Sequence, residues 1–258
     1  MNQPNMSASR VVEVDEDITQ WYPGSAETSG SRPFITIHYA QTLDGRIATR
    51  TGDSQWIGGN ASLRLAHALR ATHDTVMVGV GTVLADNPRL TVRHVAGRSP
   101  ERVIVDSTLR TPLDANVVAD GAAHTVIATT GSAPPSRVAE VRSRGVEVIT
   151  LGCDDWGHVN LTELLTCLTS RGVGSVLIEG GRALITSALR QRLVDRYVVC
   201  VSAKLVGEGI AAVGDLGIQR LNEALTFTAA RFMPLEEDLI FDGWLSPVRE
   251  GVGTESWE

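Results

Sequence analysis

The sequence predicts an α/β fold, with helices flanking a mostly parallel central sheet and an antiparallel hairpin at its C-terminal end. Three observations indicate it. Short β-branched runs alternate with helix-like patterns from Phe34 onward. Several of these runs are almost uniformly apolar, which is typical of parallel strands covered on both faces. Two strand-like runs within 227–245 are separated by an acidic turn over 235–238, the pattern of a hairpin.

The individual elements follow from the same periodicities. Strands are expected where β-branched and apolar residues cluster, over 34–40, 74–80, 102–106, 124–130, 147–151, 175–179 and 196–203. Helices are expected where apolar residues recur at helical spacing, over 61–72, 135–145, 161–172 and 182–193. Asn160 is placed to cap the third of these helices, and Gly145 and Gly172 are placed to end the second and third.

Composition limits the class of protein. The chain has 258 residues, of which 43% are hydrophobic and 21% charged, a globular profile rather than a disordered one. No run approaches the roughly 20 apolar residues that span a bilayer, and no secretory signal begins the chain, so we expect no membrane partner and a cytoplasmic location. Turn formers mark an N-terminal arm over 1–31, followed by a single domain over 32–248 and a tail over 249–258.

Charge and metal-ligand patterns exclude two further classes. The net charge of −7 and the lack of a basic stripe argue against nucleic acid as a partner. Cys153, Cys167 and Cys200 are widely spaced and odd in number, which favours reduced and mostly buried thiols. No C-x-x-C and no H-x-x-x-H pair occurs, so no metal site is expected.

Glycines at two strand ends are the first candidate site. Gly180 and Gly181 stand between a predicted strand and a helix, where free helix amides can hold a pyrophosphate. A plain tight turn explains two glycines equally well, and the absence of G-x-G-x-x-G excludes a Rossmann fingerprint. A similar strand ends at Gly79, where Gly81 and Thr82 open a short turn that Asp86, Asn87 and Pro88 close.

Polar residues after these turns have two readings each. Thr82 could donate to a phosphate or a ribose, and Asp86 could accept from a ribose hydroxyl or cap the turn. Arg89 and Arg93 follow on a run that reads as extended, where side chains four apart face one side. Solvated arginines in a loop are the alternative.

The segment 43–74 adds further candidates. Leu43-Asp44-Gly45 reads as a turn, and Ser54-Gln55-Trp56 precedes a helix that carries Arg70. Trp56 is either a core residue or a flat wall against a planar ring. Arg70 is either a partner of the helix dipole or, if it converges with Arg93, half of a phosphate site.

Read in order, these segments resemble one family. They are P-F-I-T-I-H-Y-A-x-T-L-D-G-R-I-A, S-Q-W-I, L-R-A-T-H-D, V-G-V-G-T-V-L-A-D-N-P-x-L-T-V-R, R-V-I-V-D, V-L-I-E-G-G and L-V-D-R-Y. Together they resemble the riboflavin-biosynthesis reductases, the reductase half of a bifunctional deaminase–reductase. The resemblance extends over about residues 32–245 and implies a dihydrofolate-reductase-like fold.

The resemblance implies a homodimeric reductase that uses NADPH and converts the ribosyl group of 5-amino-6-(5-phosphoribosylamino)uracil to ribityl. Positions that match the family's nucleotide contacts are Ala40, Trp56, Gly79, Gly81, Thr82, Asp86, Ser107, Gly180, Gly181, Arg182, Ala183 and Leu184. Positions that match its substrate contacts are Ser54, Arg70, Leu90, Arg93 and Glu179. On this basis Arg70 and Arg93 are expected to clamp the substrate phosphate, and Glu179 to hydrogen-bond the reacting substrate.

Two departures from the family pattern stand out. His38 occupies a position where the family has a lysine, so it is either a catalytic group that donates a proton or hydrogen bond, or a satisfied strand histidine. The zinc-deaminase pattern of H-A-E with P-C-x-x-C is missing, which predicts a stand-alone reductase or a divergent paralogue.

Two rival functions remain open. A pterin reductase such as a dihydrofolate reductase would be expected to place a carboxylate on the first helix, and residues 55–73 contain no Asp or Glu. A non-catalytic NADPH-binding protein would not need Ser54, Arg70, Arg93 and Glu179 together.

The preference for NADPH over NADH is implied only by the resemblance. Locally, Ser107, Thr108 and Arg110 could receive a 2′-phosphate, whereas an inward Asp106 would repel it.

Overall fold

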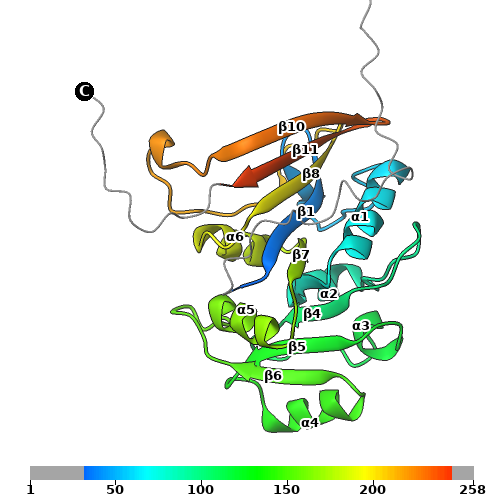
Figure 1. Ribbon diagram of the computed structural model, residues 1–258, viewed down its shortest axis with the longest axis vertical. Helices are drawn as coiled ribbons and strands as arrows, with labels where there is room; N and C mark the ends of the chain where they lie inside the picture. Colours follow the sequence, from blue (N-terminus) through cyan, green and yellow to red (C-terminus); the bar gives the residue numbers. More distant parts are fainter. Residues whose placement is uncertain (1–31, 246–258) are drawn as a thin grey trace, which may run out of the picture.

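The computed structural model describes residues 32–245, so the predicted arm and tail lie outside the described residues. Within that range a nine-stranded sheet has the order β10-β11-β8-β1-β7-β3-β4-β5-β6 (Figure 1). Its strands are β1 (Phe34–Thr42), β3 (Thr75–Gly79), β4 (Glu101–Val105), β5 (Thr125–Thr130), β6 (Glu147–Leu151), β7 (Ser175–Glu179), β8 (Arg196–Ser202), β10 (Phe227–Leu235) and β11 (Asp238–Leu245).

The direction of the strands confirms the predicted fold class. Every pair from β8 through β1 and β7 to β6 is parallel. β11 pairs antiparallel with both β8 and β10, and the hairpin turns at Glu236 and Glu237 as the acidic run indicated. Two shorter strands that the sequence pattern did not predict, β2 (Arg46–Thr49) and β9 (Gly209–Ala211), form a separate ribbon.

Four helices lie where periodicity placed them: α1 (Asn60–Thr72), α4 (Pro135–Ser143), α5 (Leu161–Ser170) and α6 (Arg182–Arg190). The Asn160 side chain accepts a hydrogen bond from the Glu163 amide at the start of α5, which confirms the predicted cap. Gly145 and Gly172 follow the ends of α4 and α5 with φ of 79° and 84°, the left-handed conformation that ends helices.

The segment after β3 corrects two predictions. The expected turn at Gly81 is a helix, α2 (Val80–Asp86), which buries Val83 and ends at Asn87 with φ of 41°. The valines favour this helix because their burial outweighs the cost of one interior glycine. The run that carries Arg89 and Arg93 is not an extended strand, since Leu90 between them has φ of 56°. The four-residue helix α3 (Asn116–Ala119) was also not predicted from the sequence.

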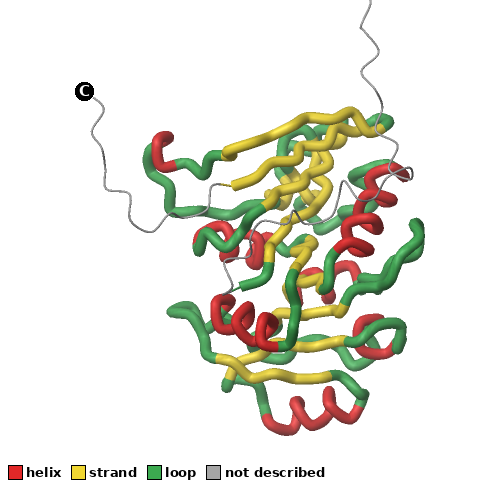
Figure 2. Tube along the Cα trace, in the orientation of Figure 1, coloured by secondary structure: helices red, strands yellow, loops and turns green. Residues whose placement is uncertain are grey.

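Helices cover both faces of the sheet (Figure 2). α5 and α6 pack on one face through residues such as Leu164 and Ile185. α1 packs on the other face through Leu65 and Leu69, and α2, α3 and α4 continue that layer. No helix in the described range is long and apolar enough to cross a bilayer. The parallel strands therefore end at a common edge, where the loops after β1, β3, β7 and β8 gather.

A buried ion cluster ties the hairpin to the sheet. Asp242 on β11 accepts two hydrogen bonds of 2.8 Å from Arg196 on β8. It also accepts from Arg231 on β10 at 2.7 and 2.9 Å, and both guanidinium groups lie over the Trp244 ring. Asp242 is fully buried, so these arginines compensate a charge that water cannot reach.

Candidate active site

Gly79 at the end of β3 lies against the glycine turn after β7. Gly180 and Gly181 have φ of 72° and 83°, which L side chains rarely adopt. A Cβ on Gly181 would lie 3.3 Å from the Thr82 Oγ1 and 3.5 Å from the Gly79 amide nitrogen. A larger residue at position 181 would therefore crowd the Thr82 side chain and need a backbone conformation that L residues rarely adopt.

The start of α6 has free donors. No side chain caps this helix, and the bond from the Ile185 amide to the Gly181 carbonyl closes its first turn. The amides of Arg182, Ala183 and Leu184 precede that bond and are left for an acceptor at the positive end of the helix dipole. The Leu184 side chain itself is buried in the core, so only its backbone can meet a ligand.

The segment before α1 reaches the end of α2. The Ser54 hydroxyl donates to Asp86 Oδ1 at 3.3 Å, and burial raises the pKa of that carboxyl group despite the hydrogen bond. Trp56 is 70% exposed, which excludes the core reading. Its ring is thus available to a ligand, as required if Trp56 packs its flat face against a planar ring.

His38 lies in the middle of the sheet, in register with Glu179 on β7 and Val198 on β8. Its Nδ1 is 3.0 Å from the Val198 carbonyl oxygen, so Nδ1 must carry the proton and donate it. Burial lowers the pKa of His38, with Glu179 opposing the effect, so the ring is neutral at pH 7. Nε2 is then an acceptor. Ala40 follows on the same face of β1 and is half-buried.

Glu179 is held by a bidentate ion pair. Arg70 Nε donates to Glu179 Oε1 at 2.7 Å and Nη2 donates to Oε2 at 2.6 Å. The remaining terminal nitrogen, Nη1, donates to the Thr91 carbonyl at 3.1 Å. Both side chains of the pair are 11% exposed. All three nitrogens of Arg70 are therefore engaged, and Glu179 has a fixed orientation.

Arg93 converges on Arg70, as the sequence suggested. Its Nη1 donates to the Thr91 Oγ1 at 2.7 Å and to the same Thr91 carbonyl that Arg70 contacts, at 3.3 Å. Burial, then the neighbouring charges of Arg70 and Arg89, lower the pKa of Arg93. Within residues 32–245 its Nε and Nη2 have no hydrogen-bond partner. Positive charge thus accumulates here with donors to spare.

His67 belongs to this cluster and was missed in the sequence. Its Nδ1 accepts a 2.8 Å hydrogen bond from the Arg93 amide, so the neutral ring carries its proton on Nε2. Burial first, then Arg70 and Arg93, lower the pKa of His67 to about 3. The available signal was its place three residues before Arg70, which puts both on one helix face.

Two predicted residues lie apart from this cluster. The Ser107 hydroxyl accepts from the Val159 amide at 3.1 Å, and its carbonyl accepts from Thr130. The Leu90 side chain is buried in the core, which leaves only its backbone for a substrate. Near Ser107, the buried Asp106 accepts two hydrogen bonds from Thr111, while Thr108 and Arg110 are exposed.

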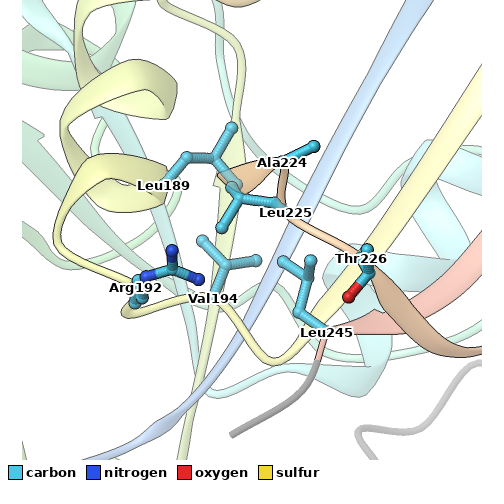
Figure 3. A pocket seen from close by; sticks show the side chains of 7 residues that line it. All are labelled: Leu189, Arg192, Val194, Ala224, Leu225, Thr226 and Leu245. Atoms are coloured by element: carbon cyan, nitrogen blue, oxygen red, sulfur yellow. The ribbon is translucent and has the colours of Figure 1, made fainter. Parts of the chain in front are cut away.

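Other possible sites are few in the described part of the chain. No three His, Cys, Asp or Glu residues within 32–245 are grouped to hold a metal ion. The cysteines are unpaired, and Cys153 is exposed rather than buried as expected, because it lies in the loop after β6. A cavity of about 50 Å³ lies among Leu189, Leu225 and Leu245, and none of the predicted site residues lines it (Figure 3).

Glycines at the ends of two adjacent parallel strands, beside a cluster of arginines, are typical of α/β proteins that bind anionic ligands. Its sequence matches the family described as the RibD C-terminal domain over residues 33–241. The chain belongs to that family.

Individual relatives agree with this assignment. The chain is 43% identical over 216 residues to a 2,5-diamino-6-ribosylamino-4(3H)-pyrimidinone 5′-phosphate reductase of Methanothermobacter thermautotrophicus, covering 82% of this chain and 97% of that protein. It is 38% identical over 210 residues to the riboflavin biosynthesis protein RibD of Aquifex aeolicus, covering 81% of this chain and 57% of the relative.

A solved structure is similar as well. It is a diaminohydroxyphosphoribosylaminopyrimidine deaminase/5-amino-6-(5-phosphoribosylamino)uracil reductase of Thermotoga maritima. The TM-score is 0.66 at 28% identity, over 83% of this chain and 57% of that one. The chain therefore spans little more than half the length of the RibD protein of Aquifex and of the Thermotoga deaminase/reductase, and almost all of the reductase from Methanothermobacter.

Proposed function

We propose that this protein is an NADPH-dependent reductase of a phosphoribosylamino-pyrimidine, acting in riboflavin biosynthesis without a deaminase half. The observation that carries the proposal is that the glycines at the ends of β3 and β7 lie directly beside the arginine cluster. At the end of β7 the two parts are joined directly, because Glu179 and Gly180 are consecutive in the chain. Two anionic ligands can then meet at one strand end. The names of the relatives supply the reaction class.

The nucleotide end of the site suits a pyrophosphate. Gly79 and Gly181 leave no side chain between the start of α2 and the turn after β7, and the first amides of α6 lack intrahelical partners. Trp56 offers an exposed aromatic face, and Thr82 lies beside Gly181 with its hydroxyl group. These residues would hold the cofactor. Exposed side chains such as Arg110 would bind its 2′-phosphate and so select NADPH over NADH.

The substrate end suits a phosphate group. Arg93 has two uncommitted nitrogens and is repelled by Arg70 and Arg89, so an anion would relieve that repulsion. Arg70 is engaged with Glu179 and acts on the substrate through it. These contacts divide the expected clamp into two roles: Arg93 binds the phosphate, and Arg70 orients the carboxylate.

The reduced nicotinamide supplies a hydride when it is bound. The protein's own residues place the electrophilic ribosyl carbon close to it, which is the main requirement of such a transfer. Glu179, fixed by Arg70, would hydrogen-bond the reacting substrate. His38, neutral and protonated on Nδ1, would accept a hydrogen bond at Nε2, so the proton that completes the reduction comes from water or another donor.

The test is NADPH oxidation by the purified protein with three substrates in parallel: the diaminopyrimidinone phosphate, the aminouracil phosphate and dihydrofolate. Turnover of either pyrimidine, with none of dihydrofolate, is the expected result. Turnover of dihydrofolate alone would replace the proposed substrate by a pterin. Tight NADPH binding with no turnover of any of the three would leave a non-catalytic protein.

The proposal includes a homodimer and a cytoplasmic location. β10 forms one edge of the sheet, and Phe232 on this strand is 67% exposed. An open edge strand with an exposed aromatic side chain is a surface that a second copy would cover. Sedimentation of the wild type and of Phe232→Glu tests the dimer, which we expect the substitution to weaken.

A further inference from the structure

Lys204 is the only lysine in the sequence, since the other 22 basic residues are arginine. Its Nζ donates to the Trp56 carbonyl at 2.6 Å and to the Ile57 carbonyl at 2.8 Å. These two acceptors belong to consecutive residues and face one point. A compact ammonium group with three tetrahedral donors suits that arrangement better than a planar guanidinium fork.

The backbone around Lys204 is well anchored. The Lys204 carbonyl accepts from the Leu43 amide at 2.9 Å, in the turn that follows β1. In the same turn Asp44 accepts from the Gly207 amide at 2.6 Å and from the Thr42 hydroxyl at 2.5 Å. These hydrogen bonds, Thr42 first, lower the pKa of Asp44 to about 2. The ammonium group thus extends from a fixed base formed by the loops after β1 and β8.

The segment that Lys204 holds has little other support. Residues 54–58 lie outside helices and strands, and the Trp56 ring makes no aromatic contact with any described residue. Ser54 adds one hydrogen bond of 3.3 Å to Asp86, and the Gln55 amide donates to the adjacent Asp53 at 3.1 Å. Because the ring is exposed, the backbone of the segment sets its position, and Lys204 binds that backbone at Trp56 itself.

We propose that Lys204 is a positioning residue for the nucleotide site, which fixes the 54–57 segment so that the Trp56 ring stands ready to meet the cofactor. The inference rests on the proposed function only in the identity of that cofactor. The apparent affinity of a site falls in proportion to the population of its competent form. Loss of the ammonium group therefore weakens nucleotide binding but leaves the chemistry of the bound complex intact.

The kinetic test compares Lys204→Met with Arg50→Met, which removes the same charge from an exposed position in a nearby loop. Lys204→Met should raise the KM for NADPH about tenfold, as expected if the competent form falls to about a tenth, with kcat unchanged. Lys204→Arg should be intermediate, and Arg50→Met should resemble the wild type. A fall in kcat at unchanged KM would mark Lys204 as merely structural and overturn the proposal.

A second measurement does not depend on turnover. Reductive methylation followed by peptide mass spectrometry gives the reactivity of the single lysine, with the lysine introduced by Arg50→Lys as an exposed reference in the same molecule. We expect Lys204 to react several-fold more slowly than the reference. Equal rates would show that the contact to Trp56 does not persist and would overturn the proposal. If Lys204 is labelled slowly but the protein does not oxidise NADPH, the contact to Trp56 is present and the proposed function is wrong instead.

Discussion

Arg70 and Glu179 join the last turn of α1 to the carboxyl end of β7 through two hydrogen bonds of 2.7 and 2.6 Å. The pair uses both oxygens of the carboxylate, and Arg70 directs its remaining nitrogen to Thr91. Three of the five N–H groups of Arg70 make these bonds, which suits a residue that orients Glu179. Arg93 shares the Thr91 carbonyl, and within residues 32–245 its Nε and Nη2 have no hydrogen-bond partner.

The two arginines should therefore differ in their kinetic effect. Arg93→Ala should raise the KM for the phosphorylated substrate about 10- to 100-fold, the loss of one or two charge-assisted hydrogen bonds. Arg70→Ala should instead lower kcat, because Glu179 loses its orientation. Steady-state kinetics with NADPH saturating measures both, and a substrate analogue without phosphate is the control. Identical effects of the two substitutions would contradict this division.

His38→Lys should keep or improve turnover of the pyrimidine. The resemblance places a lysine at this position, and the nearby charge of Glu179 would stabilise an ammonium group there. His38→Phe, which fills similar volume without hydrogen-bonding groups, is the control and should be slower. Loss of turnover in His38→Lys would mean that His38 serves a different substrate.

Stability should fall as the pH drops below about 6.5, the ordinary pKa of histidine. Burial is the main cause that lowers the pKa of His67 to about 3 and of His73 to about 4. The unfolded chain therefore binds protons in this window that the folded protein does not. The contribution of the two histidines to the free energy of unfolding is complete above about pH 6.5 and declines toward about pH 4 for His73 and about pH 3 for His67. Each histidine contributes up to about 1.4 kcal/mol per pH unit.

Urea unfolding at about pH 7, 6 and 5 measures this slope. His67→Asn and His73→Asn should each flatten it, since neither variant takes up the proton at that position on unfolding. His158→Asn is the control, because the His158 side chain is 69% exposed. An unchanged slope in both buried variants would place the acid sensitivity elsewhere.

Gly181→Ala should weaken NADPH binding about tenfold or more. The new methyl group would lie 3.3 Å from Thr82 Oγ1, and φ of 83° adds a backbone cost of about 1–2 kcal/mol. Gly121→Ala is the matched control, with φ of 59° and nothing within 4 Å of the added carbon. It should lose similar stability but bind NADPH normally. Calorimetric titration of both variants separates the two effects.

Asp242→Asn should destabilise the fold by about 3–5 kcal/mol, because it removes the negative charge that faces the buried Arg196. Arg231→Gln should cost no more than about 1 kcal/mol, since the Arg231 side chain is 43% exposed. Urea unfolding gives both values. A small effect of Asp242→Asn would mean that the cluster contributes orientation rather than stability.

Much of the fold could be predicted from the sequence because burial on two faces leaves mostly apolar strands. The runs over 34–40 and 175–179 are of this kind and lie where expected. Helix α2 was missed because Gly79 and Gly81 are typical of a turn. Burial of Val83 stabilises a helix there instead. β2 and β9 were missed because their pairing joins residues far apart in the chain, which local patterns do not report.

The site was predictable to the same extent. Residues with a chemical signature, such as Gly181 and Arg93, stand out in the sequence pattern itself. His67 and Lys204 do not, because their roles arise from backbone groups of Arg93 and Trp56 that only the fold brings near. The ion pair between Arg70 and Glu179 likewise depends on how α1 packs against β7, which the local sequence does not report.

The adjacency of Glu179 and Gly180 has a mechanical consequence. Under the proposed function Glu179 would contact the substrate and Gly180 the nucleotide, so consecutive Cα atoms about 3.8 Å apart would connect the two ligands. Thermal breathing of β7 against its neighbours would carry both reactants together as a rigid unit. The spacing between the Glu179 carboxylate and the glycine turn is then set mainly by covalent geometry, and it should tolerate loosening of the surrounding sheet.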